Sequence, residues 1–371
     1  MTLSLRCLAC GREYDAGPDE PWRCSCGNPL KFTERPLPGS EPPVFAAIDT
    51  REGLWTFEEF LPIGKRVTLG EGWTPLIDAL EFECEFKLEY VFPTGSFKDR
   101  GAATTLSRAL EVGTQRVIED SSGNAGAAIA TYAARAGVDA EIYVPAGAKE
   151  SKLRAISRAG GEVVPVEGTR EDVTNACIER VESGAGGYAS HAWNPAFYVG
   201  TQTVALEIAA QRDWSAPDAV LVPLGHGTLF LGAYRGFRAL YEAGWIEELP
   251  RLYGAQAAGY DPVARKFHSK SRGWDGGGEA DGRNDLADGI RIREPARREE
   301  ITEAIERTNG DALAIDEDAT ERALDRLHRA GFYTEPTCAV APAALDELRE
   351  RNAIDADEDV VVALTGSGLK S

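Results

Sequence analysis

The chain alternates between short apolar runs bounded by glycine or proline and longer segments with apolar residues at spacings of three and four. The apolar runs predict strands over residues 116–120, 140–145, 161–168, 218–223 and 359–366. The spaced segments each end at glycine and predict helices over residues 98–113, 124–137, 149–160 and 228–244. Strands that are apolar on both faces and alternate with helices predict a mainly parallel, doubly wound α/β architecture.

Two stretches interrupt this pattern. Residues 34–45 are rich in proline, which neither continues a helix nor pairs within a sheet, so they predict a linker. Residues 269–289 are rich in glycine and aspartate and have no apolar period. We interpret them as a solvated surface loop, with a mobile lid as the alternative.

A chain of 371 residues is long enough to bury a full core, and its length predicts two or three domains. It contains no uncharged apolar run of the ~20 residues that span a bilayer. The first residues also lack the apolar core of a secretory signal. We therefore expect a cytoplasmic protein with no membrane contact.

The chain is strongly acidic, with a formal net charge of -20 and an isoelectric point near 4.8. Such a surface repels nucleic acid, so we expect no nucleic-acid partner. Only nine of the residues are lysine. An acidic, lysine-poor exterior is typical of proteins that stay hydrated in high salt, which makes a halophilic source one hypothesis and an ordinary acidic protein the other.

Four of the seven cysteines lie in the first 26 residues, as two close pairs separated by thirteen residues. The four are Cys7, Cys10, Cys24 and Cys26. Two turns that each carry two thiolates predict a tetrahedral Zn²⁺ site, which would fold a segment too small to be stable alone. The alternatives are a pair of disulfides or an empty thiol cluster, and the C-x-C half is tighter than the common C-x-x-C.

The first of three glycine-containing loops is Pro93 to Gly101, which leads into a predicted helix. Lys98 lies in the first turn of that helix, where the positive end of the helix dipole lowers the pKa of an ammonium group. A lowered pKa makes the amine a better nucleophile toward an aldehyde. A solvated surface lysine is the alternative, although lysine is scarce in this chain.

The second loop, residues 120–126, follows the predicted strand 116–120. Its small residues expose successive backbone N–H groups together with hydroxyl and amide side chains, an arrangement suited to a carboxylate. A capped turn between a strand and a helix is the alternative.

The third loop, residues 224–228, lies between the predicted strand 218–223 and the predicted helix 228–244. Its glycines let the backbone approach an anion, and the start of the helix supplies N–H donors, so we expect a phosphate here. The loop is not a P-loop, because no Lys-Ser or Lys-Thr pair follows it. It is not the dinucleotide fingerprint either.

The motifs in these loops carry a family resemblance. TGSFKDRG (94–101) resembles the cofactor-lysine motif of pyridoxal-phosphate (PLP) enzymes of the tryptophan-synthase β fold, and LGEGWTPL (69–76) resembles the segment that precedes it in threonine synthases. The other similar segments, in the expected order, are SSGNAG (121–126), VPLGHGTLFLGA (222–233), EPT (335–337) and LTGSGLK (364–370). The cysteine-rich start is similar to that of many threonine-synthase-like chains.

The resemblance implies a fold-type II architecture, with PLP in the cleft between two doubly wound domains, a small zinc ribbon and a homodimer. The implied divisions are a zinc-ribbon-like segment (1–35), a linker with the start of the large domain (36–100), a smaller α/β domain (101–200) and the rest of the large domain (201–371).

The resemblance also implies roles for individual residues. Lys98 would bind the cofactor covalently and later carry protons, and Asn124 would bind the ring hydroxyl. The implied substrate contacts are Ser121, Ser122, Gly123 and Asn194. The implied phosphate contacts are Gly225, His226, Gly227 and Thr228. Thr365, or else Ser367, would give the pyridine nitrogen a neutral hydroxyl partner, which favours elimination and replacement over transamination.

One stretch departs from the family pattern. Threonine synthases that use O-phosphohomoserine have Asn-Pro-x-Arg, in which the arginine binds the substrate phosphate, whereas this chain has phenylalanine at 197. An aromatic ring cannot reproduce bidentate binding by a guanidinium. Lys152 or Arg154 would be an alternative source of charge. We expect His191 and Trp193 either to line the pocket or to pack in the core.

Three functions remain open at this point. The first is a threonine-synthase-like lyase that converts O-phosphohomoserine to threonine and phosphate. The second is a serine or threonine ammonia-lyase, or a β-replacing synthase, on the same scaffold, and Phe197 favours it. The third is a ribbon-bearing adaptor without catalysis. For the two enzyme readings the expected ligand of the main body is a small amino acid.

Overall fold

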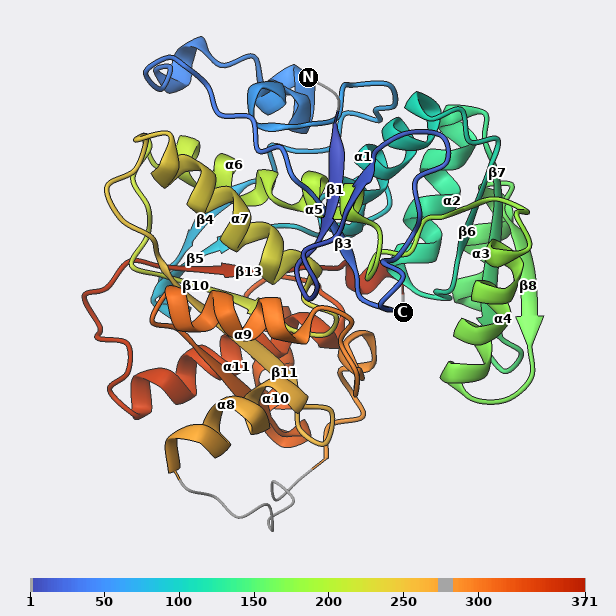
Figure 1. The fold of residues 1–371 in the computed structure, drawn as a ribbon. Helices are drawn as coiled ribbons and strands as arrows, with labels where there is room; N and C mark the ends of the chain where they lie inside the picture. The colour runs from blue at the N-terminus through green and yellow to red at the C-terminus, as the bar shows by residue number, and fades with distance from the viewer. Residues whose placement is uncertain (1–2, 273–282, 371) are drawn as a thin grey trace.

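The computed structural model describes residues 3–272 and 283–370 (Figure 1). The chain begins with a three-stranded antiparallel sheet in the order β2-β1-β3. Its strands are β1 (Ser4–Cys7), β2 (Glu13–Asp15) and β3 (Leu30–Phe32). The predicted linker then runs to two 3-10 segments, η1 (Phe45–Ala47) and η2 (Thr50–Phe60), and contains no strand.

A six-stranded sheet, in the order β12-β11-β10-β13-β5-β4, forms the larger part of the body. Its strands are β4 (Leu76–Ala79), β5 (Cys84–Lys87), β10 (Ala219–Pro223), β11 (Arg251–Ala257), β12 (Asp311–Ile315) and β13 (Val360–Ala363). All pairings are parallel except that of β4 with β5. The helices and 3-10 turns of this part are η3 (Leu80–Phe82), α6 (Thr203–Gln211), α7 (Thr228–Glu242), α8 (Pro262–Arg272), η4 (Asp288–Ile290), α9 (Arg298–Arg307), α10 (Glu317–Arg329), α11 (Pro336–Glu350) and η5 (Gly368–Lys370).

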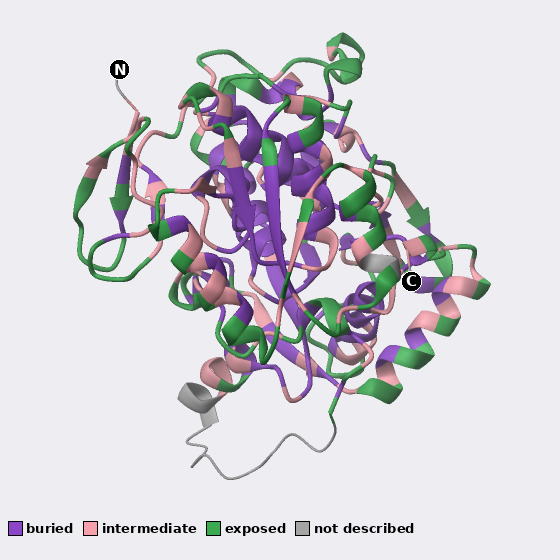
Figure 2. Cartoon of the chain, turned by 90° about the vertical axis from the view of Figure 1, so that its right-hand side faces the viewer, coloured by how far each residue is buried: buried purple, intermediate pink, exposed green. Residues whose placement is uncertain are grey.

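A second, four-stranded parallel sheet has the order β8-β7-β6-β9. Its strands are β6 (Arg116–Glu119), β7 (Asp139–Pro145), β8 (Glu162–Val166) and β9 (Gly187–Tyr188). The accompanying helices are α1 (Lys98–Glu111), α2 (Asn124–Ala136), α3 (Glu150–Arg158), α4 (Arg170–Glu182) and α5 (Pro195–Thr201). Figure 2 shows buried residues concentrated in the central strands and the helices beside them, with exposed residues on the outer helices.

All five predicted strands and all four predicted helices are confirmed. The predicted strand 359–366 ends early, at Ala363, because the backbone N–H groups of Thr365 and Gly366 donate to the sulfur of Cys338 instead of to a neighbouring strand. Within the described residues, no helix is long and apolar enough to cross a membrane.

The segment 269–289, predicted to be a surface loop, falls partly outside the described residues. Its described end does pack: the side chain of Asn284 is fully buried and donates to the carbonyl oxygen of Ile315 and to the hydroxyl of Thr320. An amide side chain with such partners fixes a loop without an apolar period. The pattern of apolar and polar residues in this segment does not predict the buried position of Asn284.

A buried ionic cluster joins the two parts of the body. The Arg100 guanidinium in the first turn of α1 makes two hydrogen bonds to Glu89, of 2.7 and 2.6 Å, and two to Glu207 on α6, of 2.5 and 2.7 Å. Lys87 at the end of β5 donates to Glu207 at 2.9 Å and to the carbonyl oxygen of Thr74 at 2.7 Å. All four charged side chains are fully buried, and two cations balance two anions.

We predict that Arg100→Met destabilises the protein by about 3–5 kcal/mol, because two buried carboxylates lose their main partner. Denaturant unfolding of the wild type and the variant measures the difference. Arg238→Ala is the matched control, since Arg238 forms a part-exposed pair with Glu242 within one helix and its loss should cost less than about 0.5 kcal/mol. Equal losses in the two variants would contradict the prediction.

Candidate active site

The three predicted loops meet at one cavity of about 440 Å³, between the four-stranded and six-stranded sheets. Each loop lies after the carboxyl end of a parallel strand or at the start of a helix, where ligands bind in open α/β sheets. Of the predicted site residues, those lining the cavity are Lys98, Ser121, Ser122, Gly123, Asn124, Gly225, His226, Gly227, Thr228 and Thr365. Its volume lies within the usual range for cofactor and small-molecule sites.

Lys98 is the first residue of α1, and its amine has no hydrogen-bond partner among the described residues. The Nζ atom lies 4.0 Å from the centre of the Phe97 ring. Burial lowers the pKa of Lys98 to about 8, although Glu335 and Glu119 act in the opposite direction. The sequence pointed to the helix dipole as the cause, but removal from water is the larger one.

The loop before α7 has the properties of an anion site. Gly227 has φ +80°, and a Cβ atom there would lie 2.5 Å from the Ile301 side chain, so only glycine fits. The N–H groups of the first turn, beginning at Thr228, have no partners within the helix. His226 Nδ1 is buried and without a partner among the described residues. This cradle of unpaired donors fits the phosphate of PLP.

Asn124, the first residue of α2, has two partners that the sequence did not predict. Its Nδ2 donates to both carboxylate oxygens of Glu335, at 3.1 and 3.0 Å. Its Oδ1 accepts from Lys370 Nζ at 2.8 Å. Both partners belong to motifs of the family resemblance, EPT and LTGSGLK, but only spatial contact reveals that they meet at Asn124.

The turn after β13 brings Thr365 into the cavity. Its hydroxyl lies 3.5 Å from the sulfur of Cys338, which also accepts the backbone N–H of Thr365 at 3.1 Å. The alternative residue, Ser367, does not line the cavity; its backbone N–H donates to the carbonyl oxygen of Gly95. A neutral hydroxyl inside the cavity suits the ring nitrogen of PLP.

Asn194 and Phe197 both have structural contacts. Asn194 caps α5: its Oδ1 accepts from the N–H of Ala196 and its Nδ2 donates to the carbonyl oxygen of Tyr188. Its role as a substrate contact stays a prediction. Phe197 is fully buried, and a Cβ atom at Gly101 would lie 2.2 Å from its ring, so the ring occupies core space against α1.

The cations that line the cavity are Lys98, Arg170 and Arg291. Arg170 has an ion pair of 3.4 Å with Asp120. Of the two alternative charges considered from the sequence, Arg154 is more than half exposed, pairs with Glu150 and does not line the cavity. The side chain of the other, Lys152, lies outside the described residues.

His191 lines the cavity as well, whereas Trp193 packs against Trp22 with ring centres 5.2 Å apart. The Nδ1 atom of His191 lies 2.8 Å from Oε1 of Glu119, the last residue of β6. Thus one of these two aromatic residues faces the site and the other belongs to the packing around it.

A separate cavity of about 550 Å³ lies between residues 40–65 and the rings of Trp214 and Trp245. It is larger, but none of the three predicted loops reaches it. Size alone does not identify a site, because the convergent polar groups are in the smaller cavity.

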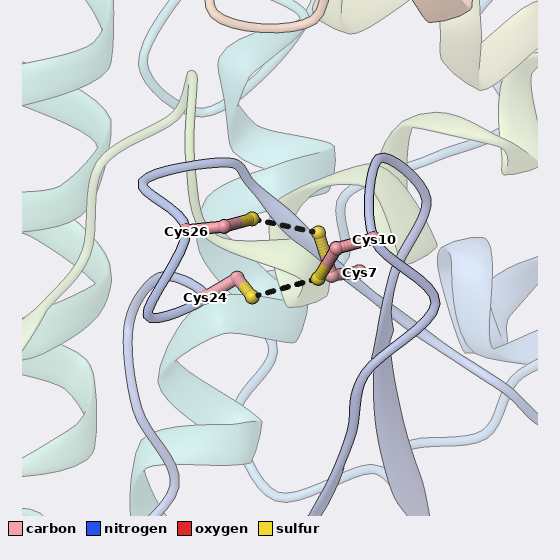
Figure 3. Close-up of side chains that lie close together, drawn as sticks. All are labelled: Cys7, Cys10, Cys24 and Cys26. Carbon is pink, nitrogen blue, oxygen red and sulfur yellow. Dashed lines mark hydrogen bonds between the residues drawn. The ribbon is translucent and has the colours of Figure 1, made fainter.

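The four N-terminal cysteines also come together (Figure 3). Their sulfur atoms all lie within 4.8 Å of one another, and Cys7–Cys26 and Cys10–Cys24 are separated by 3.6 and 3.5 Å. These distances are far longer than a disulfide bond. They are close to the edge of about 3.8 Å that a tetrahedral Zn–S bond length of about 2.3 Å gives, so the donor set fits a zinc ion.

Comparisons with known proteins identify the family of the chain. The family described as "Pyridoxal-phosphate dependent enzyme" matches residues 67–366. The chain is 32% identical to a protein named threonine synthase from Methanocaldococcus jannaschii, over 98% of this chain and 92% of that protein. It is 30% identical to one of the same name from Mycobacterium tuberculosis, over 92% and 91%.

Solved structures have the same fold. A T.th. threonine deaminase superposes with a TM-score of 0.65 at 26% identity, over 79% of this chain and 92% of that one. Maize serine racemase superposes with a TM-score of 0.67 at 23% identity, over 80% and 88%. The chain therefore belongs to the family of pyridoxal-phosphate dependent enzymes, with the fold-type II architecture and the lyase class that its motifs imply.

Proposed function

We propose that this enzyme breaks a carbon–oxygen bond at the β or γ carbon of an amino acid, and that its reaction is of the threonine-synthase type, from O-phosphohomoserine to threonine and phosphate. The observation that carries this proposal is the convergence of Lys98, the 121–124 loop, the 225–228 loop and Thr365 on one cavity. Similarity to proteins named threonine synthase over 98% of the chain supports the choice of reaction.

When bound, PLP withdraws electrons from the α-carbon of the substrate and makes the α-proton acidic. The residues of the chain supply the remaining requirements. The serine hydroxyls and N–H groups of 121–123 hold the substrate carboxylate, and the donors of 225–228 hold the cofactor phosphate. Lys98, buried and unpaired among the described residues, accepts the α-proton and returns it.

A second candidate is a serine or threonine ammonia-lyase, or a β-replacing synthase. The observation that favours it is Phe197, which lies fully buried in the core where the family pattern has a phosphate-binding arginine. Solved structures named threonine deaminase and L-serine ammonia-lyase share the fold, which is compatible with this candidate. Both candidates use the same loops and the same lysine.

Incubation of the pure holoenzyme with O-phosphohomoserine, threonine and serine separates the two candidates. The first candidate predicts that phosphate and threonine appear in equal amounts from O-phosphohomoserine. The second predicts 2-oxobutanoate from threonine or pyruvate from serine, with no threonine formed. Phosphate, amino-acid and 2-oxo-acid assays on one sample measure all products, and no turnover of any of the three would contradict both the threonine-synthase and the ammonia-lyase reaction.

The lowered pKa of Lys98 predicts how PLP attaches to the apoenzyme. The neutral amine is the attacking form; with a pKa of about 8, about a tenth of it is neutral at pH 7, against about one in a few thousand for an ordinary lysine. The attachment rate should therefore rise about tenfold per pH unit below pH 8 and level off above it. Stopped-flow absorbance measures the rate, and a rise that continues to pH 10 would contradict the lowered pKa.

The site of attachment has its own control. Borohydride reduction of the holoenzyme followed by peptide mass mapping should find a pyridoxyl group on the peptide that contains Lys98. Lys98→Ala should lose that adduct and at least about a thousandfold in turnover, since it removes both the attachment point and the proton carrier. An adduct on another lysine would overturn the assignment.

We also propose that Cys7, Cys10, Cys24 and Cys26 bind a structural zinc ion, as the sulfur separations support. Leu5, Leu30 and Phe32 from the same segment are buried in the main core, so the metal would hold a part of the chain that packs against the body. Zinc that closes a four-thiolate site stabilises a small segment directly.

Metal analysis of the purified protein tests the zinc proposal. We expect about one zinc ion per chain. The Cys10→Ser and Cys26→Ser double variant should lose the metal and become sensitive to proteolysis within residues 3–32. Cys84→Ser, outside the cluster, is the control and should keep it. An unchanged zinc content in the double variant would remove the proposal.

The remaining expectations from the sequence stay predictions. They concern a homodimer, a cytoplasmic location, the absence of nucleic-acid and membrane partners, the four domain divisions and a high-salt source. The adaptor hypothesis loses its basis, because the chain belongs to an enzyme family and retains the candidate catalytic lysine.

A further inference from the structure

A buried carboxyl–imidazole pair lies beside the cavity that contains Lys98, with the imidazole at the cavity wall and the carboxyl group behind it. Glu119, the last residue of β6, is fully buried, and His191 is 8% exposed and forms part of the cavity wall. Their contact, 2.8 Å from Oε1 to Nδ1, is short enough for a hydrogen bond. The other imidazole nitrogen, Nε2, has no protein partner among the described residues.

Aromatic neighbours fix the plane of the imidazole. The His191 ring packs edge-on against His226, with centres 5.2 Å apart, and against Phe197, with centres 6.1 Å apart. The phenylalanine that replaces the expected arginine therefore supports the imidazole. The two rings, together with the contact to Glu119, hold His191 in one orientation at the cavity wall.

The carboxyl group has one satisfied oxygen and one that is not. Glu119 Oε2 is buried and has no hydrogen-bond partner among the described residues. A buried carboxylate with a bare oxygen is costly, so the geometry favours the protonated acid, which donates to Nδ1. Nδ1 then accepts, and the remaining proton of the neutral imidazole is on Nε2.

The surrounding charges agree with this state. Burial raises the pKa of Glu119 well above its usual value, and Asp120 adds to the rise, while Arg170, a hydrogen bond from the backbone of His191 and Lys98 oppose it. Burial lowers the pKa of His191 well below its usual value, and Lys98, His226 and Arg170 lower it further. Both shifts favour the neutral form of each group, in agreement with the state that the geometry favours.

We propose that His191 and Glu119 transfer the proton of the β-hydroxyl group of the amino acid. His191 is the catalytic residue, and Glu119 is the residue that positions His191 and exchanges a proton with it. The proposal rests on the proposed function. It assigns the pair to the cleavage or formation of the bond between the β carbon and a hydroxyl group, and not to the release of a phosphate group.

The proton transfer balances in the direction of elimination. The Cβ–O bond breaks and its electron pair leaves with oxygen, which takes the proton from Nε2 to become water. Nδ1 takes the proton of Glu119, which leaves a neutral imidazole and a carboxylate. The electron pair of the α C–H bond forms the Cα–Cβ double bond as Lys98 takes the α-proton.

Addition of water is the same step in reverse. The carboxylate withdraws the proton from Nδ1, Nε2 takes a proton from the attacking water, and the new bond forms between oxygen and the β carbon. Threonine has its hydroxyl on the β carbon, so a threonine synthase forms this bond and an ammonia-lyase breaks it. The pair therefore serves either candidate function.

The leaving group provides the sharpest test. Glu119→Gln keeps a donor to Nδ1 but has no proton to give. With serine or threonine, whose hydroxyl leaves only with a proton, we expect kcat to fall by at least about 100-fold with little change in KM. With β-chloroalanine, whose chloride needs no proton, the fall should be less than about threefold. His191→Gln should behave in the same way.

If the enzyme accepts O-phosphohomoserine, the same variant should still release phosphate. Threonine formation should fall by at least about 100-fold, and 2-oxobutanoate should make up the difference. Glu141→Gln is the matched control, because Glu141 is a buried carboxylate on the neighbouring strand β7 that pairs with Arg180 and Arg116, away from the cavity. It should leave the ratios of the products unchanged.

A measurement without turnover tests the protonation state. The chain has four histidines, so ¹⁵N-histidine NMR spectra are simple, and the His191 signals are those lost in His191→Gln. We expect a neutral imidazole with its proton on Nε2 between about pH 6 and 8. An imidazolium at pH 7, a proton on Nδ1, or equal losses with serine and β-chloroalanine would each overturn the proposal.

Different experimental results would contradict the proposed function and the proposed role of the Glu119–His191 pair. A holoenzyme that turns over no amino acid would contradict the proposed function, while the NMR spectra would still decide the state of the pair. A holoenzyme that turns over serine normally after Glu119→Gln would leave the proposed function intact and remove the inference.

Discussion

The start of α1 is fixed by charges that have no access to water. Arg100 lies two residues after Lys98, and its guanidinium joins Glu89 beside β5 to Glu207 on α6. Each partner would carry a large desolvation cost if another were missing, so the cluster tolerates only one arrangement. Because the lysine begins the helix that carries the guanidinium, the cluster fixes where the amine lies in the cavity. A lysine on a frayed helix start would be solvated and would keep an ordinary pKa.

The two sheets contribute different parts of the cavity. The six-stranded sheet contributes the anion cradle after β10 and the turn that carries Thr365 after β13, whereas the four-stranded sheet contributes the 121–124 loop after β6. Both sets lie at carboxyl ends of parallel strands, so a single cavity collects them. Cys338 fixes the turn that carries Thr365. Its sulfur accepts the backbone N–H groups of Thr365 and Gly366, which would otherwise pair with a neighbouring strand and extend β13.

The sequence predicted most of what depends on short-range pattern. The helix starting at Lys98 and the cradle around Gly227 follow from glycine positions and apolar spacing, and both are present. Contacts between distant segments were not predictable: Lys370 reaches Asn124 from the other end of the chain, and Asn284 packs inside a stretch with no apolar period. In each case the deciding interaction is a hydrogen bond of one polar side chain, which leaves no periodic trace.

The exchange at position 197 shows why single departures from a family pattern need the three-dimensional context. From the sequence alone, Phe197 means only that a guanidinium group is missing, which weakens the case for a phosphorylated substrate. In the structure the ring also packs against His191, and His191 in turn meets Glu119. The ring at this position therefore lies in the core behind the cavity and helps to hold the imidazole of His191, which lines the cavity. Phosphate leaves as a stable anion and gains most from a cation, whereas hydroxide leaves only when it is protonated. The effect of the exchange on the choice of leaving group therefore depends on which charged groups face that leaving group, and Arg170 and Arg291 still line this cavity.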